Sequence, residues 1–154
     1  MSVLKFQLNL VTENDQQLSS ALLAVAARHG DDFEIVEGCK LFSQWGQSRL
    51  KALALLSERL DGHPGTDALP FGHSLLGNNF EGSYGLLRDL QDLLLLVHQT
   101  NAIWITIAQA AKAMKNELLH QTSLTFAGET DRQIAWLCTQ IKTLAPQALS
   151  VPTN

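Results

Sequence analysis

One short motif in this 154-residue sequence has a direct chemical meaning: Glu117 followed three positions later by His120. On a helix, residues three apart lie on the same face, so both side chains point to one side. In di-iron and di-manganese helical bundles a Glu-x-x-His pair supplies a carboxylate and an imidazole ligand. The simpler interpretation is a pair at a helix end, since two fixed residues alone specify little.

A complete di-metal site needs more ligands than this pair provides. It takes one glutamate from each of two further helices and a second Glu-x-x-His. The first half of the chain offers His29 and Glu37, but a lysine stands three positions after Glu37, where the histidine should be. Asp89 and Asp92 are also three apart, although aspartate is a less usual bridge. The simpler interpretation of all these acids is a solvated helix face or partners of a helix N-terminus.

The composition argues for a single helical domain with a large apolar content. The chain is 45% hydrophobic and only 17% charged, where about a quarter is usual. This balance predicts either a large core or a partly covered outer surface, and we therefore expect a homo-oligomer, with a dimer as the first expectation. The formal net charge is -4 and no basic run exists, which argues against nucleic-acid binding.

The cysteines and the apolar runs bear on the cellular compartment. Cys39 and Cys138 belong to no CxxC or CxxH pattern, which is typical of reduced, buried thiols. The first residues lack the pattern of a signal peptide. The longest purely apolar run, residues 93–97, is far too short to span a bilayer. We therefore expect a cytoplasmic protein that does not enter a membrane.

The spacing of apolar residues predicts several helices that would position these side chains. They are expected over residues 15–29, 32–60, 83–110, 117–126 and 129–145. Asp31 with Glu34 resembles a capping box at the start of the second helix. A single helix through to residue 120 would be too long for its partner, so we expect a break near Lys115 and Asn116. Pro146 is expected to end the last helix.

The remaining segments complete the predicted domain layout. Residues 3–11 alternate apolar and polar, which is a strand-like period. Two interpretations are open: an extended arm, paired with another copy or lying on the bundle, or the first turns of a helix. Residues 61–80, rich in glycine and proline, predict a long crossover loop. The layout is an arm (1–14), a first helical half (15–60), this loop, a second helical half (81–146) and a tail (147–154).

A set of short motifs marks the second half of the chain: Leu-Arg-Asp-Leu at 87–90, Ala-Ala-Lys-Ala at 110–113, Asn-Glu-Leu-Leu at 116–119 and Gly-Glu-Thr-x-x-Gln-Ile at 128–134. Together they resemble the ferritin-like superfamily, and above all its small bacterial stress proteins. The resemblance covers a little over a third of the chain. It implies an all-α, ferritin-like up-down bundle with a long crossover, usually oligomeric, and in some members two metals between the helices.

Carried over position by position, the resemblance implies a reduced ligand set. Glu129 matches a glutamate of the family, whereas the family's glutamate on the preceding long helix falls near Thr100, which is no carboxylate. Glu117 and His120 fall in the linking segment and not at the ligand position. A metal site in this chain would need an unusual ligand set. Its candidate metal ligands are His29, Glu37, Glu117, His120 and Glu129, and iron or manganese would be the metal.

Three functions follow as hypotheses. The first is a ferritin-like bundle with a degenerate metal site and a binding or structural role, not an enzyme. The second is a metal-dependent oxidase or metal-storage protein that uses the five candidate ligands, which would then have to converge in one pocket. The third is a bundle that holds an organic ligand between Trp45, Trp104 and Trp136, in a cavity of several hundred Å³. The simpler interpretation of these tryptophans is that they anchor the core.

Overall fold

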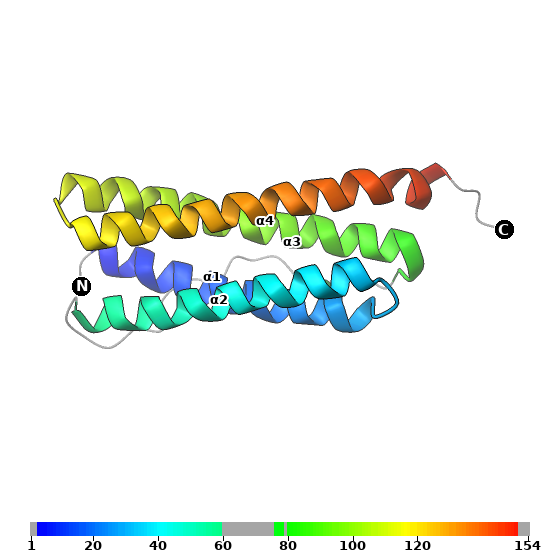
Figure 1. Ribbon diagram of the computed structural model, residues 1–154, viewed down its shortest axis with the longest axis horizontal. Helices are drawn as coiled ribbons and strands as arrows, with labels where there is room; N and C mark the ends of the chain where they lie inside the picture. The colour runs from blue at the N-terminus through cyan, green and yellow to red at the C-terminus, as the bar shows by residue number, and fades with distance from the viewer. Residues whose placement is uncertain (1–2, 60–75, 79, 151–154) are drawn as a thin grey trace.

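The chain folds into a bundle of four long helices in a computed structural model that describes residues 3–59, 76–78 and 80–150 (Figure 1). The helices are α1 (Val3–Arg28), α2 (Phe33–Arg59), α3 (Gly82–Ala113) and α4 (Glu117–Ser150). The described residues contain no strand. The predicted all-α bundle is confirmed.

The four helices form two antiparallel hairpins, α1 with α2 and α3 with α4, packed side by side (Figure 1). Asn14 lies beside Thr100 and His29 beside Asp89, so α3 runs antiparallel to α1. Since α2 is also antiparallel to α1, α2 and α3 run in the same direction. The end of α2 and the start of α3 therefore lie at opposite ends of the bundle. The predicted loop at 61–80 falls almost entirely outside the described residues.

The helix boundaries confirm several predictions. The helices at 32–60 and 83–110 are present with ends shifted by at most three residues. The break near Lys115 and Asn116 is also present, because α3 ends at Ala113 and Lys115 has a φ of 56°. The cap of α2 is one residue later than expected. The backbone N–H of Ile35 donates to the carboxylate of Asp32 at 3.2 Å, so Asp32 and not Asp31 fills this role.

The structure decides between the two interpretations of residues 3–11 and corrects one prediction about α4. Residues 3–11 form the first turns of α1 and no extended arm, because Leu8 and Val11 also sit at helical spacing and are both buried. The expected helices at 117–126 and 129–145 are one continuous helix that includes Pro146. Gly128 does not interrupt it, and the buried face of α4 continues past this glycine through Thr130 and Gln133.

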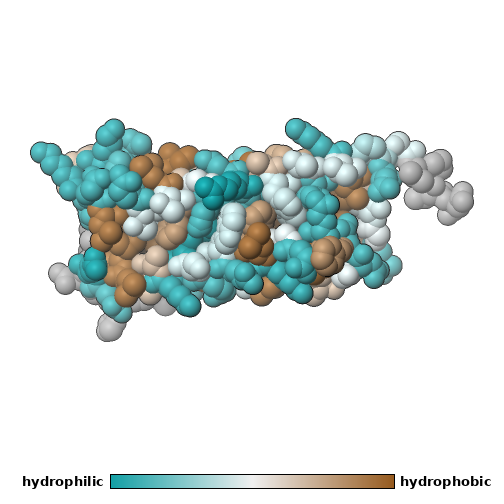
Figure 2. Space-filling model, viewed as in Figure 1, coloured by the Kyte–Doolittle hydropathy of each residue, from teal (hydrophilic) through white to brown (hydrophobic). Residues whose placement is uncertain are grey.

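The core consists of two apolar clusters, one toward each end of the bundle. One cluster surrounds Leu22, Leu90 and Leu93, and the other surrounds Leu8, Trp104 and Ile107. By length and composition, α3 is the one helix among the described residues that could cross a membrane. Here it lies within the bundle and contributes to both clusters. On the face that α2 and α4 form, hydrophobic side chains gather at the end where α4 begins (Figure 2).

Candidate functional site

Between the two apolar clusters, every helix contributes polar side chains to the interior. We call this set the mid-bundle layer. Its members are Asn14, Asp15, Ser19, Arg49, Thr100, Asn101, Glu129, Thr130 and Gln133, and all but Glu129 are buried. On each helix, these polar residues lie near the point where residues of one apolar cluster are followed by residues of the other. In helical bundles, ligand and metal sites are built in the core from side chains of facing helices, so this layer is the candidate functional site.

An ion pair between α1 and α2 lies in the centre of the layer. The Nε of Arg49 donates to Oδ1 of Asp15 at 3.0 Å, and Nη2 of Arg49 lies 2.9 Å from the same oxygen. Neither side chain has any exposed surface. On α4, Oε2 of Glu129 lies 3.8 Å from Nη1 of Arg49, and this carboxylate is 17% exposed. One guanidinium therefore lies between two carboxyl groups.

Burial governs the protonation of both carboxyl groups. It raises the pKa of Asp15, while the charge and hydrogen bond of Arg49 act in the opposite direction. The Trp104 indole also favours ionised Asp15, although its Nε1 makes no hydrogen bond of ordinary geometry. Burial likewise raises the pKa of Glu129. Arg49 opposes this rise, the charge of Asp15 adds to it, and Arg132 opposes it.

Several buried polar atoms of the layer have no hydrogen-bond partner among the described residues. They are Oδ2 of Asp15, Oγ of Ser19 and both amide atoms of Gln133, while Nη1 and Nη2 of Arg49 have only the ion-pair contacts given above. A buried polar group without a partner is costly, and ordered water commonly supplies one. The set includes both donors and acceptors, which suits water better than an ion of one sign.

On the other side of the layer, hydrogen bonds join α1, α3 and α4. The Nδ2 of Asn101 lies 2.8 Å from Oγ1 of Thr130 and 3.1 Å from Oδ1 of Asp131. Asn14 reaches from α1 to Oγ1 of Thr100 at 3.4 Å. These contacts cross helix interfaces at a fixed level, so they set the register of three helices.

The sequence contains a signal for this layer that the spacing of metal ligands misses. In α1, Asp15 stands between Val11 and Leu18 at spacings of four and three, within the apolar stripe. In α2, Arg49 stands between Phe42 and Leu53 at spacings of seven and four, which are also helical spacings. A charged residue on an apolar stripe of each of two neighbouring helices indicates a buried ion pair.

The structure does not bring the five predicted metal ligands together. His29 and Glu37 lie at the end of the bundle where α1 passes into α2, whereas Glu117 and His120 lie at the start of α4. These two ends are separated by about the length of α1, which at 26 residues is roughly 40 Å. Glu129 lies between them in the mid-bundle layer. No group of three or more His, Cys, Asp or Glu in the described chain is placed to hold a metal ion.

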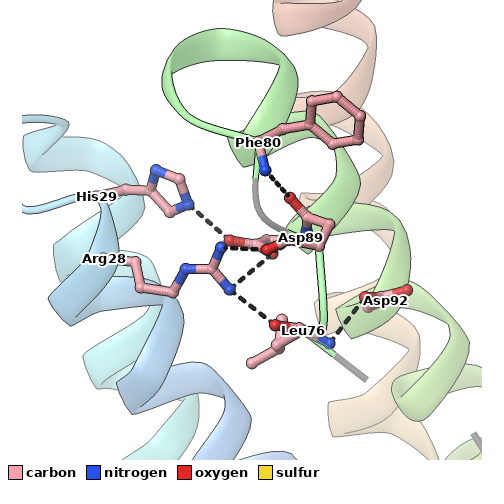
Figure 3. Close-up of polar contacts among 7 residues, drawn as sticks. Arg28, His29, Leu76, Phe80, Asp89 and Asp92 are labelled. Carbon is pink, nitrogen blue, oxygen red and sulfur yellow. Dashed lines mark hydrogen bonds and ion pairs between the residues drawn. The ribbon is translucent and has the colours of Figure 1, made fainter. Parts of the chain in front are cut away.

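His29 takes part in a separate polar cluster, which we call the end clasp (Figure 3). The fully buried carboxylate of Asp89 lies 2.7 Å from Nε2 of His29 and accepts a hydrogen bond from Nδ2 of Asn78 at 2.8 Å. Arg28 adds an ion pair to Asp89 at 3.4 Å and donates to the carbonyls of Leu76 and Asn78. The clasp therefore ties the end of α1 to α3 and to the segment before it. Asp89 is thus not on a solvated helix face.

The three tryptophans do not line one site. Trp45 and Trp136 both pack against Phe42 in one apolar cluster. The ring centroid of Phe42 lies 5.0 Å from that of Trp45 and 5.2 Å from that of Trp136. Trp104 belongs to the other cluster and packs against Phe126. An open groove of about 650 Å³ exists beside the end clasp, but none of the three tryptophans lines it. They serve as core residues in two separate places.

Comparison with known proteins adds no family to this description. No protein-family model matches the chain, and no curated protein matches it in sequence.

The buried thiol gives a direct test of the packing around α2. Cys39 is completely buried in an apolar cluster, and burial raises its pKa to about 12. Because the thiolate is the reactive form, we expect Cys39 to resist a thiol reagent at pH 8 in the native protein and to react once the chain is unfolded. Mass spectrometry of the labelled peptides separates it from the partly exposed Cys138. Rapid native labelling of Cys39 would contradict the packing described.

Proposed function

We propose that this chain is a ferritin-like bundle in which a buried ion pair stands where related bundles hold metal. In this proposal the protein is cytoplasmic, forms a homo-oligomer and has a binding or structural role, not a catalytic one. The observation that carries the proposal is the full burial of the Arg49 guanidinium within the mid-bundle layer. A fixed positive charge at this level repels a divalent cation, and it is already the counter-ion of Asp15, one of the acidic side chains that would bind such a cation.

The arrangement of the helices supports the ferritin-like part of the proposal. Two antiparallel hairpins with α2 and α3 running in the same direction require a connection that crosses the length of the bundle, as in ferritin-like folds. The two positions that the resemblance matches to family glutamates, Thr100 and Glu129, both lie in the mid-bundle layer. One of them has no carboxylate, and the other lies 3.8 Å from Arg49.

Exposed apolar side chains support the homo-oligomer, with a dimer as the simplest form. Four of them lie at one end of the bundle: Val3, Leu55, Met114 and Leu118, each more than half exposed. Apolar surface gathered in one place is typical of an association surface. The two cysteines are free thiols in the structure, as a reducing compartment would keep them.

Metal content per chain tests the proposed function. Untagged protein, expressed with iron, manganese and zinc available, is expected to contain well below one metal ion per chain by elemental analysis. Glu117→Ala and Glu129→Ala serve as matched variants, one in each of the two places where a carboxylate ligand is predicted. Near-stoichiometric metal in the native chain, lost in either variant, would overturn the proposal in favour of an oxidase or a metal-storage protein.

A further inference from the structure

We infer that two copies of this chain bind each other at the end of the bundle where α2 ends and α4 begins, with Leu118 of each copy inserted into a groove of the other. The inference rests on the homo-oligomer in the proposed function, and it adds the surface and the residues that make the contact. It does not depend on whether the chain holds metal or is related to ferritins.

The helices α2 and α4 are closely packed at one end of the bundle and leave a groove at the other. At the closed end, Gly38 of α2 lies so near the ring of Trp136 that a larger side chain would overlap it. Beside this contact, Oε1 of Glu34 accepts a hydrogen bond from Nε2 of Gln140 at 2.9 Å. At the other end, a groove of about 170 Å³ is lined by Leu56, Arg59, Asn116, Leu118 and Leu119. A cavity of about 150 Å³ can hold a benzene molecule, so this groove has room for one leucine side chain.

The same surface presents side chains that fit such a groove. Leu118 forms one edge of it and is still 53% exposed, and Leu55 on α2 is 62% exposed. Val3 and Met114 lie at the same end and are also more than half exposed, and Figure 2 shows hydrophobic side chains gathered there. A two-fold interface needs a surface that is complementary to itself, since every contact occurs twice. A groove with a protruding leucine at its edge meets this condition, so a second copy is the partner that the surface fits.

The charges around the groove favour the same partner. Arg59 lines the groove and Glu117 precedes Leu118, and neither forms an ion pair with another described residue. When Leu118 enters the groove of the second copy, Glu117 comes next to Arg59 of that copy, and the two-fold axis repeats this pair. The other exposed charges in the last turns of α2 and α3 and in the residues leading into α4 are Glu58, Lys112 and Lys115. Both signs are present, so the two copies do not meet as surfaces of like charge.

The size of the surface sets the expected strength of the dimer. Stable complexes bury about 800 Å² on each partner, whereas this surface occupies only one end of a bundle. We therefore expect a dimer in equilibrium with the monomer. Sedimentation of the native protein, at concentrations up to about 100 µM and thus about a hundredfold above a dissociation constant of about 1 µM, measures this equilibrium. The mass should rise from that of one 16.9 kDa chain toward that of two. A monomer at every concentration would overturn the inference.

Replacing Leu118 with lysine tests the inserted side chain. The change removes an apolar contact at both symmetric positions, and each contact contributes roughly tenfold or more, so the dissociation constant should rise at least about 100-fold. Leu41→Lys is the matched control, because Leu41 is 47% exposed and lies on α2 toward the opposite end of the bundle. It should leave the dissociation constant unchanged. Equal dissociation constants for the native protein and Leu118→Lys would overturn the inference.

Mixing two charge variants tests whether the contact joins separate copies. Arg59→Glu places two acidic groups at each contact and Glu117→Arg two basic groups, so each variant alone should dimerise roughly tenfold more weakly than the native chain. An equimolar mixture should form a heterodimer about as stable as the native dimer, because each of its contacts again joins opposite charges. Native mass spectrometry, with one variant labelled with nitrogen-15, identifies the heterodimer.

A control separates this fitted contact from general attraction between an acidic and a basic protein. Adding Leu118→Lys to one of the two variants should abolish the heterodimer. A heterodimer that survives this change, or a mixture that dimerises no better than its components, would overturn the inference.

These results are distinguishable from a failure of the proposed function. A dimer that is insensitive to the variants would keep the homo-oligomer and remove this contact surface, whereas a monomer at every concentration would remove both. Stoichiometric metal in a protein that dimerises as described would overturn the proposed metal-free bundle and leave the contact surface standing.

Discussion

Replacing Arg49 with methionine is expected to lower the free energy of unfolding by about 3 to 5 kcal/mol, which is the usual cost of breaking a buried ion pair. The methionine has similar length and no charge, so it leaves Asp15 buried without its counter-ion. Urea unfolding monitored by circular dichroism measures the loss. Lys51→Met, an exposed change two residues further along α2, should alter stability by no more than about 0.5 kcal/mol.

A double variant shows whether the pair itself carries this effect. Arg49→Met combined with Asp15→Leu removes both charges, and it should recover most of the stability that Arg49→Met alone loses. A single variant that loses less than about 1 kcal/mol would mean that Arg49 is hydrated, not buried in the layer. A double variant no better than the single one would mean that the charge of Asp15 is not the cause.

Replacing Asp89 with alanine is expected to cost about 2 to 3 kcal/mol, because hydrogen bonds to a charged group each contribute about 1.5 to 3 kcal/mol. Asp89 is fully buried and contacts His29, Asn78 and Arg28. The loss is smaller than for Arg49, since Arg28 and His29 keep some exposed surface and can be hydrated after the change.

Hydrogen exchange locates the effect of this second change. Asp89→Ala should lower the protection of backbone amides in the first turns of α3 and in the last turn of α1, which the end clasp joins. Amide protection in the mid-bundle layer should not change. Asp31→Ala changes an exposed acid at the same end of the bundle and is the control. It should leave amide protection unchanged both at the end clasp and in the mid-bundle layer. Uniform loss of protection along α3 would contradict the local role of the clasp.

The long helices could be predicted from the sequence because their apolar residues recur at helical spacing over many turns. The ambiguity at residues 3–11 has a physical origin: Leu4, Leu8 and Val11 fit a helical period, while Leu4, Phe6, Leu8 and Leu10 fit a strand period equally well. A short segment that satisfies both is decided by the rest of the protein, and here the continuing helix and the buried positions of Leu8 and Val11 decide it.

The candidate site could not be predicted from the spacing of metal ligands. Glu117 and His120 form a motif on one helix face, but a short motif gives no information on the side chains that other helices place opposite it. The layer is built instead from pairs that are distant in sequence, such as Asp15 with Arg49 and Asn101 with Thr130. Of the predicted ligands only Glu129 belongs to the layer, and the family resemblance is what indicates it. The polar residues within the apolar stripes can be recognised in the sequence. Which of them contact one another depends on the register between the helices, which the sequence does not show.

A crystal of the protein soaked in manganese and measured near the manganese absorption edge would show whether the mid-bundle layer binds metal. We expect no anomalous peak between the four helices, with the guanidinium of Arg49 in contact with Asp15 at the level of Thr100 and Gln133. An anomalous peak within ligand distance of Glu129, with Arg49 displaced from Asp15, would contradict this expectation. The mid-bundle layer would then be a metal centre that the ion pair closes when metal is absent.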